Sequence, residues 1–354
     1  MKRALVLLVA IPLVWLLFHL LSGGAVLTPG NMVNLFKYVS VVGILAAGMT
    51  LVIGAGHIDL SVGSLLGFLG ATGALLLAKG IPLPLALVAG AGLGIALGML
   101  HGALTAYFRV PSFIVTLGGL LAYMGLKQYI ANPVIPIRDG VLTQLGQGYL
   151  QGTAAWVFVG ILVAILLLAS GRKGLKGMRG AALASAGLIG MTVVAQQDRG
   201  LPYSVIALGF AGLLCGFIAT RTRAGRYAFA LGSNAEAARY AGLPVRGIAV
   251  FVFALMGLMA WLAGTVATSQ LMAGAADVGD QQELYAIAAC VLGGTSLRGG
   301  SGNVWMSLLG ALLMASILNG MEQVGIASTV QKIILGAILV AAVAADQWAN
   351  RKVA

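Results

Sequence analysis

The amino-acid sequence predicts an all-α protein, a polytopic transmembrane helical bundle of about 12 spans, and of no fewer than about 10, with both termini cytoplasmic. Of the 354 residues, 60% are hydrophobic and only 8% are charged, and the mean hydropathy is +1.01. A water-soluble domain of this size does not have that balance. Apolar runs of bilayer length also recur from one end of the chain to the other. We therefore expect a single transmembrane domain over residues 1–354.

Short turns or charged gaps separate the apolar runs, and each run is expected to form one helix. The expected spans are residues 1–21, 33–56, 64–78, 84–108, 112–130, 154–169, 181–195, 203–220, 248–271, 284–292, 304–319 and 326–345. The first begins with Lys2 and Arg3, as a secretory signal peptide would, but its near-complete bilayer length favours a retained span. The runs at 181–195 and 284–292 are short enough to be re-entrant. The 52 glycines fit close packing of transmembrane helices.

Orientation in a membrane explains the formal net charge of +12. With an even number of spans, most of the 21 basic residues fall in loops on one side, which the positive-inside bias identifies as cytoplasmic. Most acidic residues then lie outside, among them an acidic loop at 277–283. The basic residues occupy short gaps between spans, so no nucleic-acid partner is expected. Cys215 and Cys290 lie inside apolar runs without metal-binding spacing, and neither a metal site nor a disulfide is indicated.

Residues 221–247 form the longest polar segment of the chain, and they contain clear helix start and stop signals. Ser233 or Asn234 can cap a helix start, and Glu236, three residues after Ser233, would complete a capping box. Gly242 and the proline two residues later supply the stop. The pattern predicts a helix of roughly two turns in a cytoplasmic loop, placed to contact something outside the membrane.

Sequence motifs of an enzyme are missing. No GxxxxGK[ST], HExxH, GxSxG or CxxC pattern occurs, so we expect no catalytic residue, no metal and no cofactor. Transport would then be powered by an ion gradient or by a separate ATPase subunit, or it would proceed without an energy source. Few ionisable residues lie within the spans, where an ion-coupled carrier would need them. His19 and His101 fit structural roles better than a proton relay, and Lys37 and Lys332 can reach the headgroups from span ends.

Two unusual turns follow spans on the predicted inner side. In the first, Asp59 can cap the next helix, while Ser61 and Ser64 can satisfy backbone groups that the turn leaves free. A capped turn and a gate in a transport pathway are equally compatible with this pattern. The second is the glycine-rich turn at 293–303, which ends in Asn303 and weakly echoes the first. We treat Asp59, Ser61, Ser64 and Asn303 as candidate pathway or gate residues.

Four motifs in order resemble the permease subunits of bacterial ribose/xylose-type sugar ABC importers. They are GHIDLSVGS at 56–64, VPSFIVTLGGL at 110–120, RTRAGRYAFALGSNAEAARYAGLPV at 221–245 and GGTSLRGGSGN at 293–303. The resemblance covers nearly the whole chain. The additional hydrophobic stretch and basic loop at 171–197 exceed the shorter ribose-type pattern and are similar to the xylose-type branch.

The resemblance implies a multi-pass permease of the bacterial inner membrane that dimerises to form a pathway for a monosaccharide, a pentose such as xylose. It also implies a cytoplasmic ATP-binding subunit on the inside and a periplasmic sugar-binding protein on the outside. In that family the segment matching residues 233–242 is the coupling helix, which seats in a groove of the ATPase. The matching positions here are Ser233, Asn234, Glu236, Arg239 and Gly242. An ion-coupled secondary carrier for a small polar solute is the main alternative, and a channel or scaffold is the second.

Overall fold

The computed structural model describes residues 2–171 and 174–351, and its regular structure is almost entirely helical. The helices are α1 (Lys2–Leu21), α2 (Pro29–Gly54), α3 (Val62–Ala78), α4 (Leu83–Ala106), α5 (Ser112–Ile130), α6 (Gly140–Gln147), α7 (Gly152–Gly171), α8 (Gly174–Gln196), α9 (Ser204–Arg221), α10 (Arg223–Ser233), α11 (Ala235–Tyr240), α12 (Val245–Leu271), α13 (Gln282–Leu292), α14 (Val304–Gln323) and α15 (Ser328–Arg351). The short strands β1 (Ile135–Pro136) and β4 (Ala273–Gly274) pair antiparallel, as do β2 (Tyr149–Leu150) and β3 (Leu201–Pro202). The predicted helical bundle is confirmed.

Each predicted span corresponds to one helix of the described chain. Seven helices, α1, α2, α4, α5, α9, α12 and α14, are long and apolar enough to cross a membrane. The remaining predicted spans correspond to α3, α7, α8, α13 and α15, whose apolar parts are shorter. The protein is thus a multi-pass helical membrane protein, whereas the number of about 12 crossings stays a prediction.

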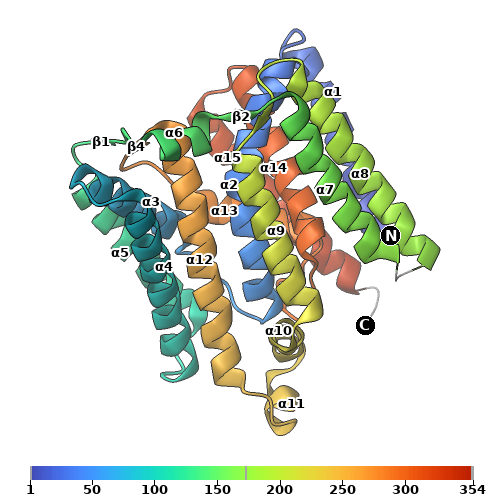
Figure 1. Ribbon diagram of the computed structural model, residues 1–354. Coiled ribbons are helices and arrows are strands. Elements are labelled where there is room, and N and C mark those ends of the chain that lie inside the picture. The colour runs from blue at the N-terminus through green and yellow to red at the C-terminus, as the bar shows by residue number, and fades with distance from the viewer. Residues whose placement is uncertain (1, 172–173, 352–354) are drawn as a thin grey trace.

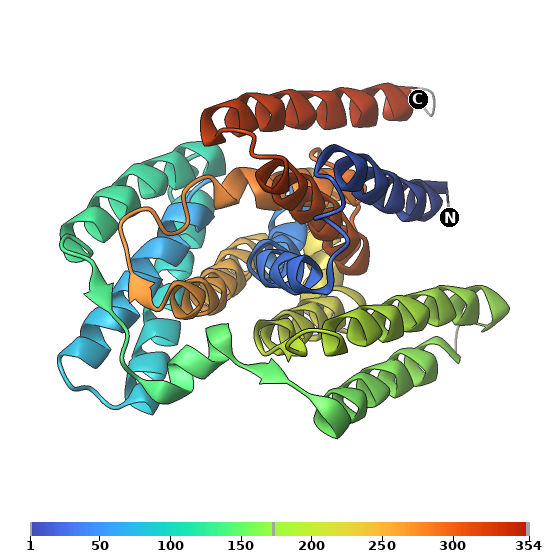
Figure 2. The same cartoon turned by 90° about the horizontal axis from the view of Figure 1, so that it is seen from above.

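The centre of the bundle is α2. Nearly all of its residues are buried, and a helix that is apolar on every side belongs in an interior. It packs against α9, α12, α13 and α14. The view from above shows α2 enclosed in this way, with α1, α15 and the α7–α8 hairpin at the periphery (Figure 2). The turn that follows α2 is therefore anchored in the buried interior of the bundle.

Glycines allow α4 and α12 to pack backbone against backbone. A Cβ atom on Gly94, Gly98 or Gly102 of α4 would lie within 3.0 Å of an α12 backbone atom. Gly257 of α12 faces α4 in the same way. The expectation that glycines serve close helix packing is confirmed for this pair.

A short helix, α6, lies at the end of the bundle opposite α10 and α11 (Figure 1). Asp139 caps α6, because its carboxylate accepts a hydrogen bond of 2.8 Å from the backbone N–H of Leu142. The Gln147 side chain accepts from Lys37 Nζ (3.1 Å) and donates to the carbonyl of Gln270 (2.5 Å). These bonds tie α6 to α2 and α12 and close this end of the bundle.

The segment between β4 and α13, expected to be an acidic outer loop, packs into the bundle. A Cβ on Gly279 would lie within 3.0 Å of the carbonyl of Gly63 in α3. The fully buried Lys127 of α5 donates to the carbonyl of Val278 (3.0 Å) and forms an ion pair with Asp280. As a result, α13 begins beside the first turn of α3.

Candidate coupling site

The predicted short helix is α11, and its start is one residue later than the capping box requires. Asn234 has extended backbone angles, and its side-chain oxygen accepts a hydrogen bond of 2.9 Å from the N–H of Ala237. Ser233 is instead the last residue of α10, and its hydroxyl donates to the carbonyl of Phe229 (3.0 Å). The predicted capping box was wrong, because a cap at Asn234 places Glu236 at the second helical position and not at the third. Asn234 alone caps the helix.

The predicted helix stop at Gly242 is confirmed. Gly242 has φ = +75°, a left-handed conformation that glycine adopts without steric cost. Its N–H donates to the carbonyl of Arg239 (3.0 Å), and the N–H of Leu243 donates to the carbonyl of Ala238 (3.1 Å). These bonds satisfy the last carbonyls of the helix. The chain then turns directly into α12.

Most of α11 faces outward. Glu236, Arg239 and Tyr240 are exposed, and the Tyr240 side chain is 82% exposed. Only Ala238 is buried. Figure 1 shows α11 projecting beyond the other helices at one end of the bundle. The helix is therefore held mainly through its chain connections to α10 and α12, and its charged face is available to another molecule.

Sequence reasoning missed α10, the helix that leads into α11. Thr222 caps it, with Oγ1 accepting a hydrogen bond of 3.2 Å from the N–H of Gly225. Ala228 and Leu231 are buried, whereas Arg223 and Arg226 are exposed. This apolar and polar alternation at helical spacing, together with Thr222, was the signal that could have revealed α10.

Five glycines bring the end of α10 against the two unusual turns. We call Gly54, Gly56, Gly232, Gly299 and Gly300 the glycine junction. A Cβ on Gly232 would lie within 3.0 Å of Gly54 O, Gly56 N and Gly300 N, and a Cβ on Gly299 would lie within 3.0 Å of Gly56 Cα. The N–H of Gly300 donates to Gly54 O at 2.9 Å. The residue two positions before the α11 cap thus touches both turns directly.

Sequence comparisons identify the class of protein that carries this arrangement. A family described as "Branched-chain amino acid transport system / permease component" matches residues 31–343. The chain belongs to this permease family. It is 37% identical over 328 residues to the xylose transport system permease protein XylH of Haemophilus influenzae, covering 88% of this chain and 87% of the relative.

Two further relatives place the permease more closely. The Escherichia coli (strain K12) xylose permease XylH is 38% identical over 330 residues, 89% of this chain and 84% of the relative. The ribose import permease RbsC of the same strain is 33% identical over 287 residues, 81% of this chain and 76% of the relative. No solved structure matches. The resemblance to ribose/xylose-type permeases is confirmed, and as a permease subunit the chain is not itself an enzyme.

In the permease, the turn after α2 is held by a buried carboxylate. One oxygen of Asp59 accepts hydrogen bonds from the N–H (2.9 Å) and the hydroxyl (2.6 Å) of Ser61. The cap position of α3 belongs to Ser61 and not to Asp59, because α3 begins at Val62. Asp59 therefore stabilises the turn itself. Ser64 is also buried, in the first turn of α3.

A buried histidine continues this network. His101 of α4 lies 3.5 Å from the Ser61 hydroxyl through Nδ1 and 2.9 Å from the Tyr123 hydroxyl of α5 through Nε2. All three side chains are buried. Both ring nitrogens thus have partners within the protein, which agrees with the structural role expected for His101. The network joins the turn after α2 to α4 and α5.

Asn303 caps the helix that follows the second turn. It is the N-cap of α14, and its side-chain oxygen accepts from the N–H of Met306 (3.3 Å). Asn303 is exposed, and among the described residues no hydrogen bond joins it or Ser64 to Asp59 or Ser61. Of the candidate gate residues, only Asp59 and Ser61 are brought together.

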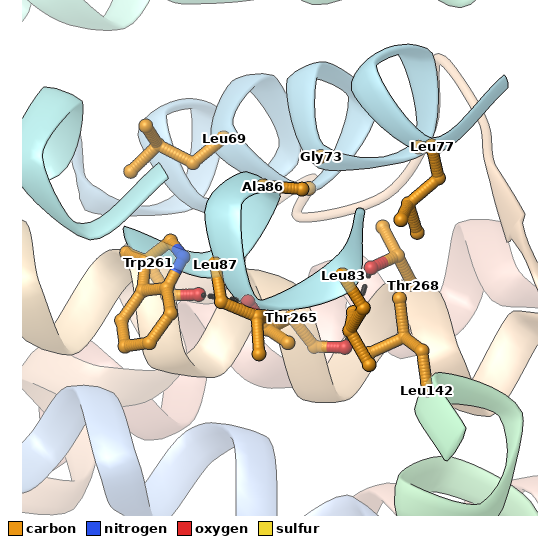
Figure 3. Close-up of a pocket in the computed structure, with 12 residues that line it drawn as sticks. Leu69, Gly73, Leu77, Leu83, Ala86, Leu87, Leu142, Trp261, Thr265 and Thr268 are labelled. Atoms are coloured by element: carbon orange, nitrogen blue, oxygen red, sulfur yellow. Dashed lines mark hydrogen bonds between the residues drawn. The ribbon is translucent and has the colours of Figure 1, made fainter. Parts of the chain in front are cut away.

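A small pocket between α3, α4, α6 and α12 offers no room for a sugar (Figure 3). Its volume is about 20 Å³, roughly the space of one water molecule. The hydroxyls of Thr265 and Thr268, which line it, donate to the carbonyls of Trp261 (2.9 Å) and Gly264 (2.7 Å) in their own helix. The lining is otherwise mostly apolar. The pocket is a packing defect between helices.

Proposed function

We propose that this permease is the membrane-spanning subunit of an ATP-driven importer that moves a monosaccharide, a pentose such as xylose, across the bacterial inner membrane. The observation that carries the proposal is the likeness to xylose transport permeases over 88% and 89% of the chain. The four sequence motifs, which lie between residues 56 and 303, support it. Both termini and the loop 221–247 would face the cytoplasm, as the positive-inside bias indicates.

Three partners belong to this proposal. The chain has no phosphate-binding loop, so a cytoplasmic ATP-binding subunit would hydrolyse ATP. A periplasmic sugar-binding protein would deliver the sugar, and a second copy of the permease would complete the pathway. The exposed Glu236 and Arg239 of α11 are the groups through which the ATP-binding subunit would fix the register of the coupling helix.

The glycine junction supplies the route by which movement of α11 reaches the turns. Ser233 and Asn234 connect α10 directly to α11, and Gly232 contacts both the turn after α2 and the turn at 293–303. Closure of the ATP-binding subunits would tilt α10 and α11 as one body and displace both turns together. Asp59, Ser61, Ser64 and Asn303 would then act by holding the shapes of the moving turns.

Reconstitution in proteoliposomes tests the proposed function. Xylose uptake should require three components: the cognate ATP-binding subunit, the sugar-binding protein, and ATP on the side of the membrane where the ATP-binding subunit lies. Uptake that is sustained by a proton or sodium gradient with no ATP-binding subunit would refute the proposal and support the ion-coupled carrier. ATP-driven uptake of another monosaccharide, but not of xylose, would retain the class and change only the sugar.

A double substitution tests the role of α11. Glu236→Gln with Arg239→Gln should release the ATP-binding subunit or uncouple its ATPase activity from uptake, while the permease still inserts in the membrane. Both side chains are exposed, so their loss costs little folding stability. Normal ATP-driven uptake by this double variant would contradict the role of α11.

A further inference from the structure

A cavity of about 390 Å³ opens beside the start of α11. It lies between the end of α4, the end of α10, the start of α12 and the turn after α2. The residues that line it are Ala55, Gly56, His57, Thr105, Ala106, Leu231, Gly232, Ser233, Asn234, Ala235, Val245, Arg246, Ala249 and Arg298. The cavity therefore touches the α11 cap, the glycine junction and the turn at 293–303 together. Its volume is many times the ~30 Å³ that a water molecule occupies in the liquid.

The charge of the cavity has one sign. Among the described residues, those with a charge that line it are Arg246 and Arg298, and none is Asp or Glu. Arg246 is exposed at the start of α12, and its guanidinium lies 5.4 Å from the centre of the Tyr107 ring at the end of α4. This cation–π contact holds the guanidinium across the gap between α12 and α4. A guanidinium placed in this way is suited to bind a carboxylate through two hydrogen bonds.

We propose that this cavity receives an acidic side chain, Asp or Glu, of the ATP-binding subunit. The inference rests on the proposed function, because it places a second contact beside the coupling helix. Asn234 and Ala235 belong both to the start of α11 and to the cavity wall. A subunit that seats α11 in its groove would therefore lie beside the cavity as well. The inserted carboxylate would be bound by Arg246.

This contact would let the partner act on the glycine junction directly. Gly56 and Gly232 lie in the cavity wall, so a side chain held there is in reach of the turn after α2. Movement of the ATP-binding subunit would act at two places, on α11 and on the cavity. Two contacts define the rotation of the attached helices better than one contact does, because the helices could turn freely about a single contact point.

Binding of the cognate ATP-binding subunit to the full-length permease in nanodiscs tests the proposal. Arg246→Gln should weaken binding about tenfold, and Arg246→Glu should weaken it further. The difference in affinity between each variant and the unmodified permease should shrink as the salt concentration rises. Arg226→Gln is the matched control, because Arg226 is exposed on α10 and does not line the cavity. It should change affinity less than about twofold. Melting temperatures of all variants show whether each one is folded.

The outcomes separate this inference from the proposed function. Unchanged affinity and salt dependence for Arg246→Glu, with weak binding by the Glu236 and Arg239 double variant, would overturn the cavity contact and leave the proposed function intact. Failure of the unmodified permease to bind the ATP-binding subunit would overturn both. A lipid headgroup is tested separately in vesicles of phosphatidylglycerol or phosphatidylcholine. If Arg246→Glu loses only its preference for phosphatidylglycerol, the cavity binds lipid and the contact with the subunit is excluded.

Discussion

Gly232 is the residue whose replacement should most selectively break the connection between α11 and the two turns. In Gly232→Ala, the added methyl group would lie within 3.0 Å of Gly54 O, Gly56 N and Gly300 N. All three are backbone atoms, so no side-chain rotation relieves the clash. Either α10 or the turns must shift, and overpacking of this kind costs about 1–3 kcal/mol.

A helix-propensity gain partly offsets that cost. Gly232 lies within α10, where alanine is preferred over glycine by about 0.5–1 kcal/mol. The net penalty is then roughly 0–2.5 kcal/mol, which is below the about 5–15 kcal/mol that keeps a domain folded. The variant should therefore fold and bind the ATP-binding subunit. The same energy corresponds to a change of up to roughly 60-fold in an equilibrium, and it should appear in the position of the turns.

The assay is the ratio of sugar transported to ATP hydrolysed in proteoliposomes. We expect Gly232→Ala to lower this ratio, by up to roughly 60-fold, while ATP hydrolysis continues. Gly247→Ala is the control, since the nearest atom to its added carbon is a side-chain carbon of Pro244 at 4.0 Å. It lies near the start of α12, close to the same loop, and should leave the ratio unchanged. A wild-type ratio for Gly232→Ala would refute the role assigned to the glycine junction.

Three further substitutions have measurable consequences. Asn234→Ala removes the α11 cap and should destabilise that helix by about 1 kcal/mol, seen as faster amide exchange in α11, whereas Asn234→Asp should retain protection. Gly242→Ala places a side chain at φ = +75° and should cost about 1 kcal/mol, while Gly242→Asn should cost less; equal melting temperatures for the two would contradict this reasoning. Lys127→Met leaves the carbonyl of Val278 and the Asp280 carboxylate without their buried partner, and should lower stability by roughly 1–3 kcal/mol. Asp280→Asn should cost at least as much, because it leaves the fully buried Lys127 ammonium without its counter-ion, and an unchanged melting temperature for Asp280→Asn would show that the pair is not arranged as described.

Local signals in the sequence located α11 because caps and stops depend on neighbouring residues. Asn234 and Gly242 act through hydrogen bonds that reach only three to five residues along the chain, so their types predicted both ends of the helix. The same signals left the choice between Ser233 and Asn234 open. Tertiary packing decided it, because α10 extends through Ser233, and the serine hydroxyl then bonds back to the preceding turn.

The sequence by itself determined the class of this protein. Apolar runs require a membrane, and four ordered motifs indicate the permease family that the comparisons confirmed. Only the tertiary structure showed which distant residues meet. Gly54, Gly232 and Gly300 belong to three separate segments, and nothing in their local sequences shows that they meet. Their contact depends on how α2, α10 and the turn at 293–303 pack together, and packing is a property of the whole fold.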